Sequence, residues 1–281
     1  MIEMTGKNSD INVNGIKVAY TNKTVIEDLS INIPEGKITT IIGPNGCGKS
    51  TLLKAIGRII GVEKGSIYLD CKDIHKLSTK ELAKRLSILP QSPTAPEGMT
   101  VEELVSYGRF PYQRGLGRLA KEDEGIINWA IAATNLTGLN DRNVESLSGG
   151  QRQRVWIAMA LAQQTSTILL DEPTTYLDMA YQLEVLELLG ELNKYHGCTI
   201  IMVLHDINLA AKFADYLIAL KDGKIVSAGC PKEVMTKEVL RNVYNIDANI
   251  VVDESSGHPI CISYQLVGRK GNRKQNVQRG A

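Results

Sequence analysis

Cysteine pairs, long apolar runs and a strong net charge are all missing from this chain. Its five cysteines, at positions 47, 71, 198, 230 and 261, form no Cys-x-x-Cys pair, so the sequence predicts reduced thiols rather than a disulfide framework. The longest uncharged stretch, residues 155–170, has 16 residues, and two of them are glutamines. It is too short and too polar to span a bilayer. The N-terminus contains Glu3 and no apolar core, so we expect no signal peptide.

The net charge is only +1, because 32 basic residues nearly balance 31 acidic ones. The charge is unevenly placed, since residues 268–281 carry five basic side chains and no acidic one, which leaves −4 on the rest of the chain. A mildly acidic body argues against a broad basic face for nucleic acid, so we expect no nucleic acid partner. We predict that residues 268–281 form a basic, disordered tail.

A glycine-rich segment, residues 43–50, follows the apolar run 38–42 and precedes a helical pattern with apolar residues at 52, 53, 56, 59 and 60. Glycines let the backbone turn and point successive N–H groups at phosphate oxygens, and the helix start adds positive partial charge. In this P-loop pattern the lysine reaches the β- and γ-phosphates and the serine ligates Mg²⁺. A glycine turn beside a surface lysine is the alternative. The expected nucleotide-binding residues are Gly43, Pro44, Asn45, Gly46, Cys47, Gly48, Lys49, Ser50 and Thr51.

Apolar strands and helical patterns alternate along the chain and predict an α/β fold. Strand-like runs at 16–20, 31–33, 38–42 and 67–69 open the chain, with Asn14-Gly15 as a turn signal ahead of the first. Later strands at 168–170, 199–204 and 216–220 alternate with helical patterns such as 179–195, which is typical of a parallel sheet covered on both faces. Asp222-Gly223 predicts a hairpin from the last of these strands to 224–228.

The region from Pro93 to Ser146 differs, because prolines mark a break and helical spacing follows, so we expect a helical insertion in the α/β core. Two short helices from Pro231 and strands at 249–253 and 260–264 are expected at the end. Five parts are predicted: a nucleotide-binding core with a β subdomain and the P-loop at 1–92, a helical subdomain at 93–146, the second part of the core at 147–245, C-terminal strands at 246–267, and the tail at 268–281.

Two adjacent carboxylates, Asp171 and Glu172, end the buried strand 167–170. The carboxyl ends of parallel strands are where an α/β fold places its ligands. Phosphoryl transfer needs one carboxylate for the metal and one group that orients or deprotonates water. Successive residues at a strand end diverge, so we assign Asp171 to Mg²⁺, through water, and Glu172 to the attacking water. Taken alone, the pair would more simply be a charged turn.

A second glycine pair lies in Leu147-Ser148-Gly149-Gly150-Gln151, ahead of a helical pattern. Ser148 suits an N-cap, and the residues alone leave a helix cap and a second anion site both open. The segments 43–50, 147–151 and 167–172, in this order and spacing, resemble those of the ATP-binding cassette (ABC) family. The resemblance covers residues 10–245 and implies a P-loop NTPase core with a parallel sheet, an antiparallel β subdomain and a helical subdomain.

The resemblance also implies roles for further residues. Tyr20 matches the aromatic residue that stacks on adenine, although a core tyrosine is the alternative. Gln91 matches the glutamine that touches the metal site, and His205 matches the histidine that contacts the γ-phosphate. Asp178 ends a segment similar to the family's D-loop. Cys47 stands at a variable position of the P-loop, and we expect its alkylation to block ATP. The predicted catalytic residues are Lys49, Gln91, Glu172 and His205, with Ser50, Gln91 and Asp171 as metal ligands.

The family resemblance implies ATP and Mg²⁺ as cofactors and a head-to-tail pair of cassettes. Ser148, Gly149, Gly150 and Gln151 would then face the ATP of the other copy. The segments 108–112, 171–178 and 204–211 look like those of cassettes that serve ferric-siderophore, haem and cobalamin importers. An ATPase subunit of that kind works with membrane permease subunits and, indirectly, with a substrate-binding protein, peripherally at the cytoplasmic face of the membrane. A cytosolic ABC ATPase acting on nucleic acid, ribosomes or iron–sulfur assembly is the open alternative.

Overall fold

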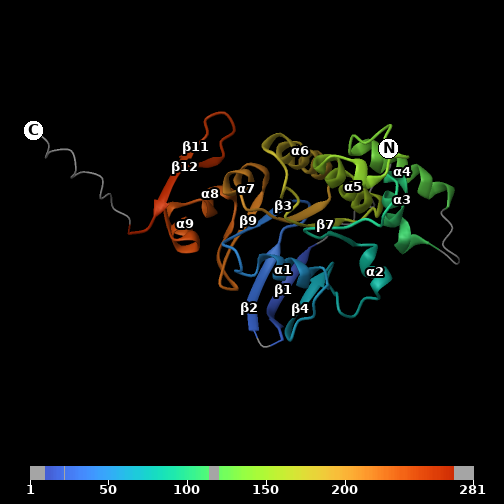
Figure 1. Ribbon diagram of the computed structural model, residues 1–281. Coiled ribbons are helices and arrows are strands. Elements are labelled where there is room, and N and C mark those ends of the chain that lie inside the picture. The colour runs from blue at the N-terminus through green and yellow to red at the C-terminus, as the bar shows by residue number, and fades with distance from the viewer. Residues whose placement is uncertain (1–9, 22, 114–119, 269–281) are drawn as a thin grey trace, which may run out of the picture.

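Figure 1 shows a computed structural model of the chain, which describes residues 10–21, 23–113 and 120–268. Its main sheet has six strands in the order β10-β9-β3-β8-β7-β6. Five of them run parallel, and β10 pairs antiparallel with β9 across the predicted Asp222-Gly223 hairpin. Every residue of β3, β7 and β8 is buried, which explains their uninterrupted apolar sequences and confirms the predicted parallel sheet. The bounds are β3 Ile38–Ile42, β6 Leu86–Leu89, β7 Thr167–Asp171, β8 Thr199–Val203, β9 Tyr216–Lys221 and β10 Lys224–Gly229.

A second, antiparallel sheet in the order β2-β1-β4-β5 forms the predicted β subdomain. One prediction about it was wrong, because Asn14-Gly15 does not precede the first strand as a turn. Instead β1 continues through both residues, and its pairing with β2 shifts register between Val13 and Ile16. Gly15 has φ 55° and donates its N–H to the Ser30 hydroxyl at 2.8 Å, so the pair makes a β-bulge. The bounds are β1 Ile11–Tyr20, β2 Lys23–Ile33, β4 Lys64–Leu69 and β5 Lys72–Asp73.

Helix α1 (Lys49–Ile56) lies between the two sheets, where Leu52, Leu53 and Ile56 join their shared core. The predicted helical pattern was wrong beyond Ile56, where the helix ends, although Ile60 still packs against this core. The helix stops at Gly57, Arg58 has φ 53°, and the side chain of Ile59 is 53% exposed. The Arg58 guanidinium donates to the carbonyls of Ile74 and Leu77 at 2.8 and 2.6 Å, which fixes the chain in its new direction. Helix α2 (Thr79–Ala83) follows, with a capping box from Ser78 and Glu81.

The predicted helical insertion is confirmed and lies on one side of the main sheet (Figure 1). Its helix α3 packs against both α4 and α5, which carries the chain back to the sheet. A buried ion pair between Arg109 and Asp123, at 2.7 Å, ties η1 to α4. The bounds are α3 Val101–Ser106, η1 Tyr107–Tyr112, α4 Lys121–Ala133, η2 Val144–Ser146 and α5 Gly149–Ala162.

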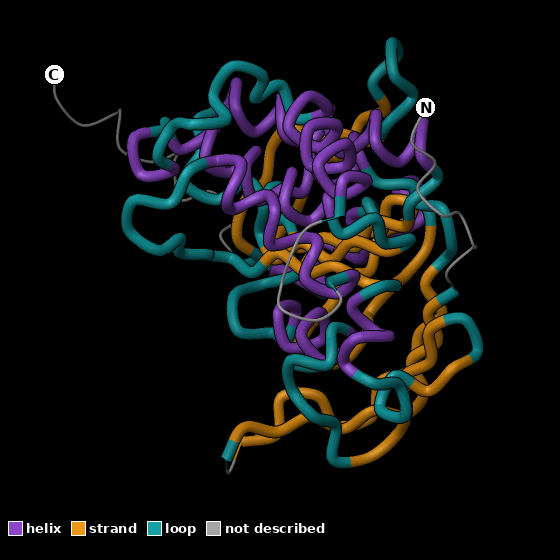
Figure 2. Tube along the Cα trace, turned by 90° about the vertical axis from the view of Figure 1, so that its right-hand side faces the viewer, coloured by secondary structure: helices purple, strands orange, loops and turns teal. Residues whose placement is uncertain are grey.

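The C-terminal region leads from the main sheet through two short helices to a separate β-hairpin. Strands β11 (Ile246–Val252) and β12 (Pro259–Leu266) lie where the sequence predicts the last two strands. They pair antiparallel, and they contact α9 and α7. Figure 2, turned by 90°, shows the helices and strands as separate layers. None of the helices within the described residues has the length and apolar character needed to cross a membrane. The predicted tail lies outside the described residues, apart from Gly268. The remaining helices are α6 Met179–His196, α7 Ile207–Phe213, α8 Pro231–Val234 and α9 Lys237–Tyr244.

Candidate functional site

The glycine segment 43–50 leads from the carboxyl end of β3, which lies between β9 and β8 inside the main sheet, into the first turn of α1. Gly43 has φ 151°, and a Cβ built on it would lie 2.2 Å from the Leu220 carbonyl oxygen and 2.8 Å from the Cys47 sulfur. Any other residue there would push the loop away from β9. Gly48, the N-cap of α1 with φ 107°, has no side chain to cover the first amides of the helix. The loop therefore presents main-chain N–H groups at a helix N-terminus, the arrangement that binds phosphate.

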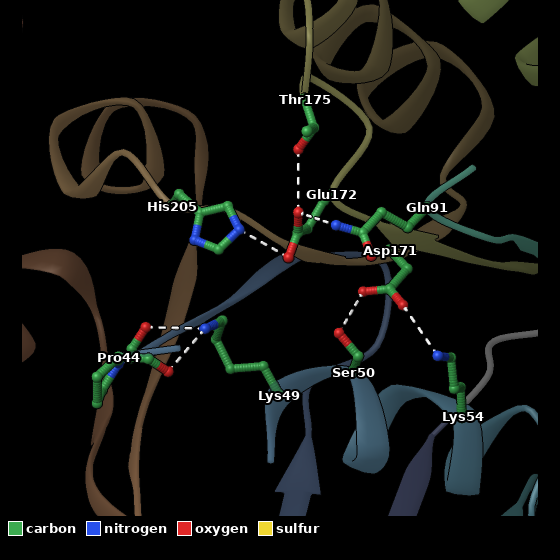
Figure 3. A network of polar contacts seen from close by, with 10 residues as sticks. Pro44, Lys49, Ser50, Lys54, Gln91, Asp171, Glu172, Thr175 and His205 are labelled. Atoms are coloured by element: carbon green, nitrogen blue, oxygen red, sulfur yellow. Dashed lines mark hydrogen bonds and ion pairs between the residues drawn. The ribbon is translucent and has the colours of Figure 1, made fainter. Parts of the chain in front are cut away.

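Lys49 points into this loop (Figure 3). Its side chain is buried, and its ammonium donates hydrogen bonds to the carbonyls of Gly43 at 2.9 Å and Pro44 at 3.0 Å. The structure thus places a positive charge beside the main-chain amides, where it would meet the outer phosphates of a nucleotide.

Asp171, the last residue of β7, reaches α1. Its Oδ1 accepts a hydrogen bond from the Ser50 hydroxyl at 2.8 Å, and its Oδ2 lies 3.9 Å from the Lys54 ammonium. Burial raises the pKa of Asp171, while the bond from Ser50 and the charge of Lys54 oppose the rise. Oδ2 is buried and accepts no hydrogen bond from the described residues. A buried carboxylate oxygen that accepts no hydrogen bond, next to a serine hydroxyl, suits Mg²⁺, which prefers oxygen ligands and keeps several waters.

Glu172 lies one residue further on, where the backbone turns with φ 54° and sends its side chain away from that of Asp171. Its Oε1 lies 2.6 Å from His205 Nε2. Its Oε2 accepts hydrogen bonds from Gln91 at 2.5 Å and from the Thr175 hydroxyl at 3.0 Å. Gln91, Glu172 and His205 follow β6, β7 and β8, and Thr175 lies in the turn after β7. Figure 3 shows their side chains meeting at the Glu172 carboxylate. The structure therefore brings together the three predicted residues Gln91, Glu172 and His205.

A cavity of about 460 Å³ opens between the loop and this carboxylate. Val25 on β2 supplies its apolar side, a residue that the sequence reasoning missed. Tyr20 is not among the lining residues; it lies at the end of β1 with 44% exposure, and its adenine-stacking role stays a prediction. A larger cavity, about 770 Å³, lies between α9 and the β11–β12 hairpin and contains none of the predicted site residues. The smaller cavity is lined by Val25, Asn45, Gly46, Gly48, Lys49, Ser50, Thr51, Gln91, Glu172 and His205.

Two more residues missed from the sequence support the site. Thr175 lies three residues after Glu172 and donates a hydrogen bond to its carboxylate. Lys54 lies one helical turn after Ser50, on the same face of α1. These short spacings along the chain were the sequence signals by which both residues could have been found.

The segment 147–151 lies outside this cavity. Ser148 caps α5: its hydroxyl accepts the Gln151 N–H at 3.3 Å, and the Gln151 side chain accepts the Ser148 N–H at 3.1 Å. The helix-cap interpretation is therefore confirmed, and the second anion site stays a prediction. Asp178 likewise caps α6 by accepting the Tyr181 N–H at 3.1 Å. The Tyr181 ring packs on Gly150, where a Cβ would come within 2.8 Å of it.

Cys47 does not offer its side chain to the cavity. The thiol is 3% exposed and packs in the core between the two sheets. Burial raises the pKa of Cys47, while the Lys49 charge opposes the rise. The Cys47 carbonyl accepts the Gly223 N–H at 2.9 Å, which anchors the loop to the β9–β10 turn. Any contact of Cys47 with a nucleotide thus falls to its main chain, and alkylation of the thiol first requires the loop to open.

Comparisons with known proteins agree with this geometry. The family model described as "ABC transporter" matches residues 26–175. The chain is 57% identical over 250 residues to the iron(3+)-hydroxamate import ATP-binding protein FhuC of Bacillus subtilis, an alignment that covers 89% of this chain and 93% of the relative.

Two solved structures extend the likeness to the whole fold. One is an inward-facing ABC transporter assigned to the metal-chelate type, with TM-score 0.79 and 28% identity over 90% of this chain and 96% of the other. The second is a dimeric ATP-binding cassette bound to ADP and Pi, with TM-score 0.67 and 29% identity over 78% of this chain and 98% of the other. By the family model that matches residues 26–175 and the relative of 57% identity, the chain belongs to the ABC transporter family.

Proposed function

We propose that this chain hydrolyses ATP with Mg²⁺ as the energising subunit of a membrane importer. One observation carries the proposal: Glu172 is held by Gln91, His205 and Thr175 at the wall of the same cavity that the P-loop lysine enters. A carboxylate positioned by three neighbours opposite a phosphate site is what in-line attack by water requires.

The roles of the individual residues rest on their contacts. Lys49 and the loop amides would hold the outer phosphates of ATP. Ser50 and Asp171 would hold Mg²⁺, the aspartate through water, and Gln91, which donates a hydrogen bond to Glu172, would be a further ligand. When bound, the metal neutralises charge on the phosphate oxygens. Glu172 would accept the proton of the attacking water, and His205, whose Nε2 already faces that carboxylate, would orient it and meet the γ-phosphate.

Glu172→Gln tests the assignment, because the amide keeps the shape of the side chain but cannot take a proton. We expect ATP binding to persist and turnover to fall by roughly 10²–10⁴-fold, the range of general-base catalysis. Glu191→Gln, on the exposed side of α6, is the matched control and should hydrolyse ATP at the wild-type rate. A near-normal rate for Glu172→Gln would remove this residue from its role.

The proposal includes a second copy of the chain. Because the segment 147–151 lies outside the cavity of its own chain, the exposed residues Ser148 and Gly149 would face a nucleotide held by another copy, with Gly150, now covered by Tyr181, and Gln151 beside them. The dimeric cassette bound to ADP and Pi supports this arrangement. Asp178, at the start of α6, would then lie near the same interface as part of the segment 173–178.

We infer that the cargo is a ferric siderophore, because the relative of 57% identity is named for iron(3+)-hydroxamate import. The chain would act peripherally, at the cytoplasmic face of the cell membrane, with permease subunits that receive a cargo-loaded binding protein. Tyr107 (43% exposed) and Phe110 (58% exposed) would form a docking face on the helical insertion, which follows Gln91 along the chain. Co-purification with a polytopic permease would separate this function from that of a non-transport ABC ATPase.

A further inference from the structure

Two residues one turn apart on α1 reach the same carboxylate. Ser50 donates a hydrogen bond to Asp171 Oδ1 at 2.8 Å, and the Lys54 ammonium lies 3.9 Å from Oδ2. Figure 3 shows both side chains pointing from α1 toward the two carboxylate oxygens. Ser50 lines the cavity between the loop and Glu172, whereas Lys54 does not. The lysine therefore faces the carboxylate from outside the nucleotide cavity.

The Asp171 carboxylate needs a balancing charge when no metal is bound. Its side chain is 1% exposed, and a buried carboxylate is costly unless it is paired. Oδ2 accepts no hydrogen bond from the described residues, and among these residues Lys54 is the one cationic group within ion-pair distance of it. The Lys54 ammonium therefore supplies the positive charge on the Oδ2 side.

The contact between Lys54 and Asp171 is an ion pair without a hydrogen bond. The lysine side chain is 37% exposed, and 3.9 Å is too long for its ammonium to donate to Oδ2. Such a contact balances the carboxylate charge but leaves the lone pairs of this oxygen open to a further donor, such as a water held by a metal. The ammonium would then share the negative charge with Mg²⁺, and two positive charges beside one carboxylate repel each other.

We propose that Lys54 is a positioning residue of the metal site: its ammonium balances the Asp171 charge while the metal is absent, and its repulsion lowers the affinity of the ADP-bound chain for Mg²⁺. The inference rests on the proposed function, because it needs Mg²⁺ beside Ser50 and Asp171. It predicts opposite effects of one substitution. Removal of the ammonium destabilises the metal-free chain and tightens metal binding, whereas loss of a merely structural contact would tighten nothing.

Lys54→Met tests this, because it keeps the aliphatic part of the side chain and removes the charge. The dissociation constant of ADP is measured by calorimetry on the full chain, once with Mg²⁺ and once with EDTA. The factor between the two constants reports the metal, since the affinity of Mg²⁺ for free ADP is the same for every variant. We expect this factor to rise roughly three- to tenfold above that of the wild type, because solvent screens part of the repulsion. The urea midpoint without metal and nucleotide should fall.

Two further variants isolate the local charge. Lys54→Arg keeps the charge and should give the wild-type factor. Lys37→Met is the matched control, because it removes the same net charge from a similar ion pair, 3.7 Å from Asp215. Lys37 precedes β3 and thus lies at the opposite end of that strand from the P-loop. Asp215 is 42% exposed, so Lys37→Met should leave the factor unchanged and shift the midpoint little.

A factor for Lys54→Met that stays at or below the wild-type value overturns the inference. An equal rise with Lys37→Met would be an effect of net charge, and an equal rise with Lys54→Arg an effect of shape; both overturn it. A midpoint for Lys54→Met no lower than that of the wild type also overturns it, because the ammonium would then not balance the buried carboxylate. If wild-type protein binds ADP no more tightly with Mg²⁺ than with EDTA, the proposed metal site itself fails, a result distinct from an unchanged factor in Lys54→Met.

Discussion

Replacing Arg109 by methionine should destabilise the chain more than any surface change. Arg109 is 4% exposed and Asp123 is 6% exposed, and their side chains meet at 2.7 Å. The guanidinium also donates to the Ala162 carbonyl at 2.8 Å and to Gln164 at 3.0 Å, and its central carbon lies 3.9 Å from the centre of the Tyr112 ring. One side chain therefore joins η1, α4 and the end of α5.

The expected loss of folding free energy follows from the groups that lose their partner when Arg109 is replaced. Methionine fills much of the space, but the Asp123 carboxylate stays buried without its counter-charge, and breaking a buried pair in this way costs about 3–5 kcal/mol. With a urea dependence of ~3 kcal/mol per molar, the midpoint should fall by about 1–2 M. A double variant, with Asp123→Asn added to Arg109→Met, removes the unpaired buried charge. The amide oxygen of the new asparagine can still accept a hydrogen bond from the Ala120 N–H, which in the wild type bonds to the Asp123 carboxylate at 2.9 Å.

Urea unfolding followed by far-ultraviolet circular dichroism measures both variants. We expect the double variant to recover most of the loss seen with Arg109→Met alone. Two results would refute the reasoning: a loss below about 1 kcal/mol for the single variant, the level of an exposed ion pair, or a double variant no more stable than the single one. Lys17→Met, which breaks the half-exposed pair with Glu63, is the control and should shift the midpoint little.

Three further predictions concern the nucleotide site and its partners. Cys47 should react slowly with iodoacetamide and faster as the pH rises above the usual thiol range, because burial raises its pKa; mass spectrometry showing fast labelling near pH 7 would contradict this. Ser148→Arg should abolish ATP-dependent dimers in size-exclusion chromatography, whereas Ser78→Ala, which removes a similar helix cap, should leave them intact; equal dimerisation by both would refute the head-to-tail interface. Phe110→Ala should lower transport at least several-fold with nucleotide affinity unchanged; normal transport would count against that docking face.

The features predicted most accurately are those that depend on residues close together in the sequence. The buried strands β3, β7 and β8 appear as unbroken apolar runs, and the glycine segment, the carboxylate pair and Ser148 are each contiguous. The turn predicted at Asn14-Gly15 was wrong because the same residue types favour both a turn and a β-bulge. Only the pairing of β1 with β2 decides between the two. The predicted helix face failed at Ile59 because the carbonyls that hold Arg58 come from a distant loop.

The supporting residues of the site could not be found in the same way. Val25 reaches the cavity only because β2 lies beside the P-loop, and that contact leaves no local pattern in the sequence. Gln91 and His205 were placed by family resemblance, and their contacts with Glu172 emerge only when β6, β7 and β8 lie side by side.

ATP binding in the presence of Mg²⁺, measured on wild-type protein and Lys49→Ala, tests the central claim most directly. The buried ammonium of Lys49 lies inside the glycine loop, so its removal should abolish binding at ATP concentrations that saturate the wild type. Wild-type protein that does not bind ATP, or a Lys49→Ala variant that binds it equally well, would contradict the account.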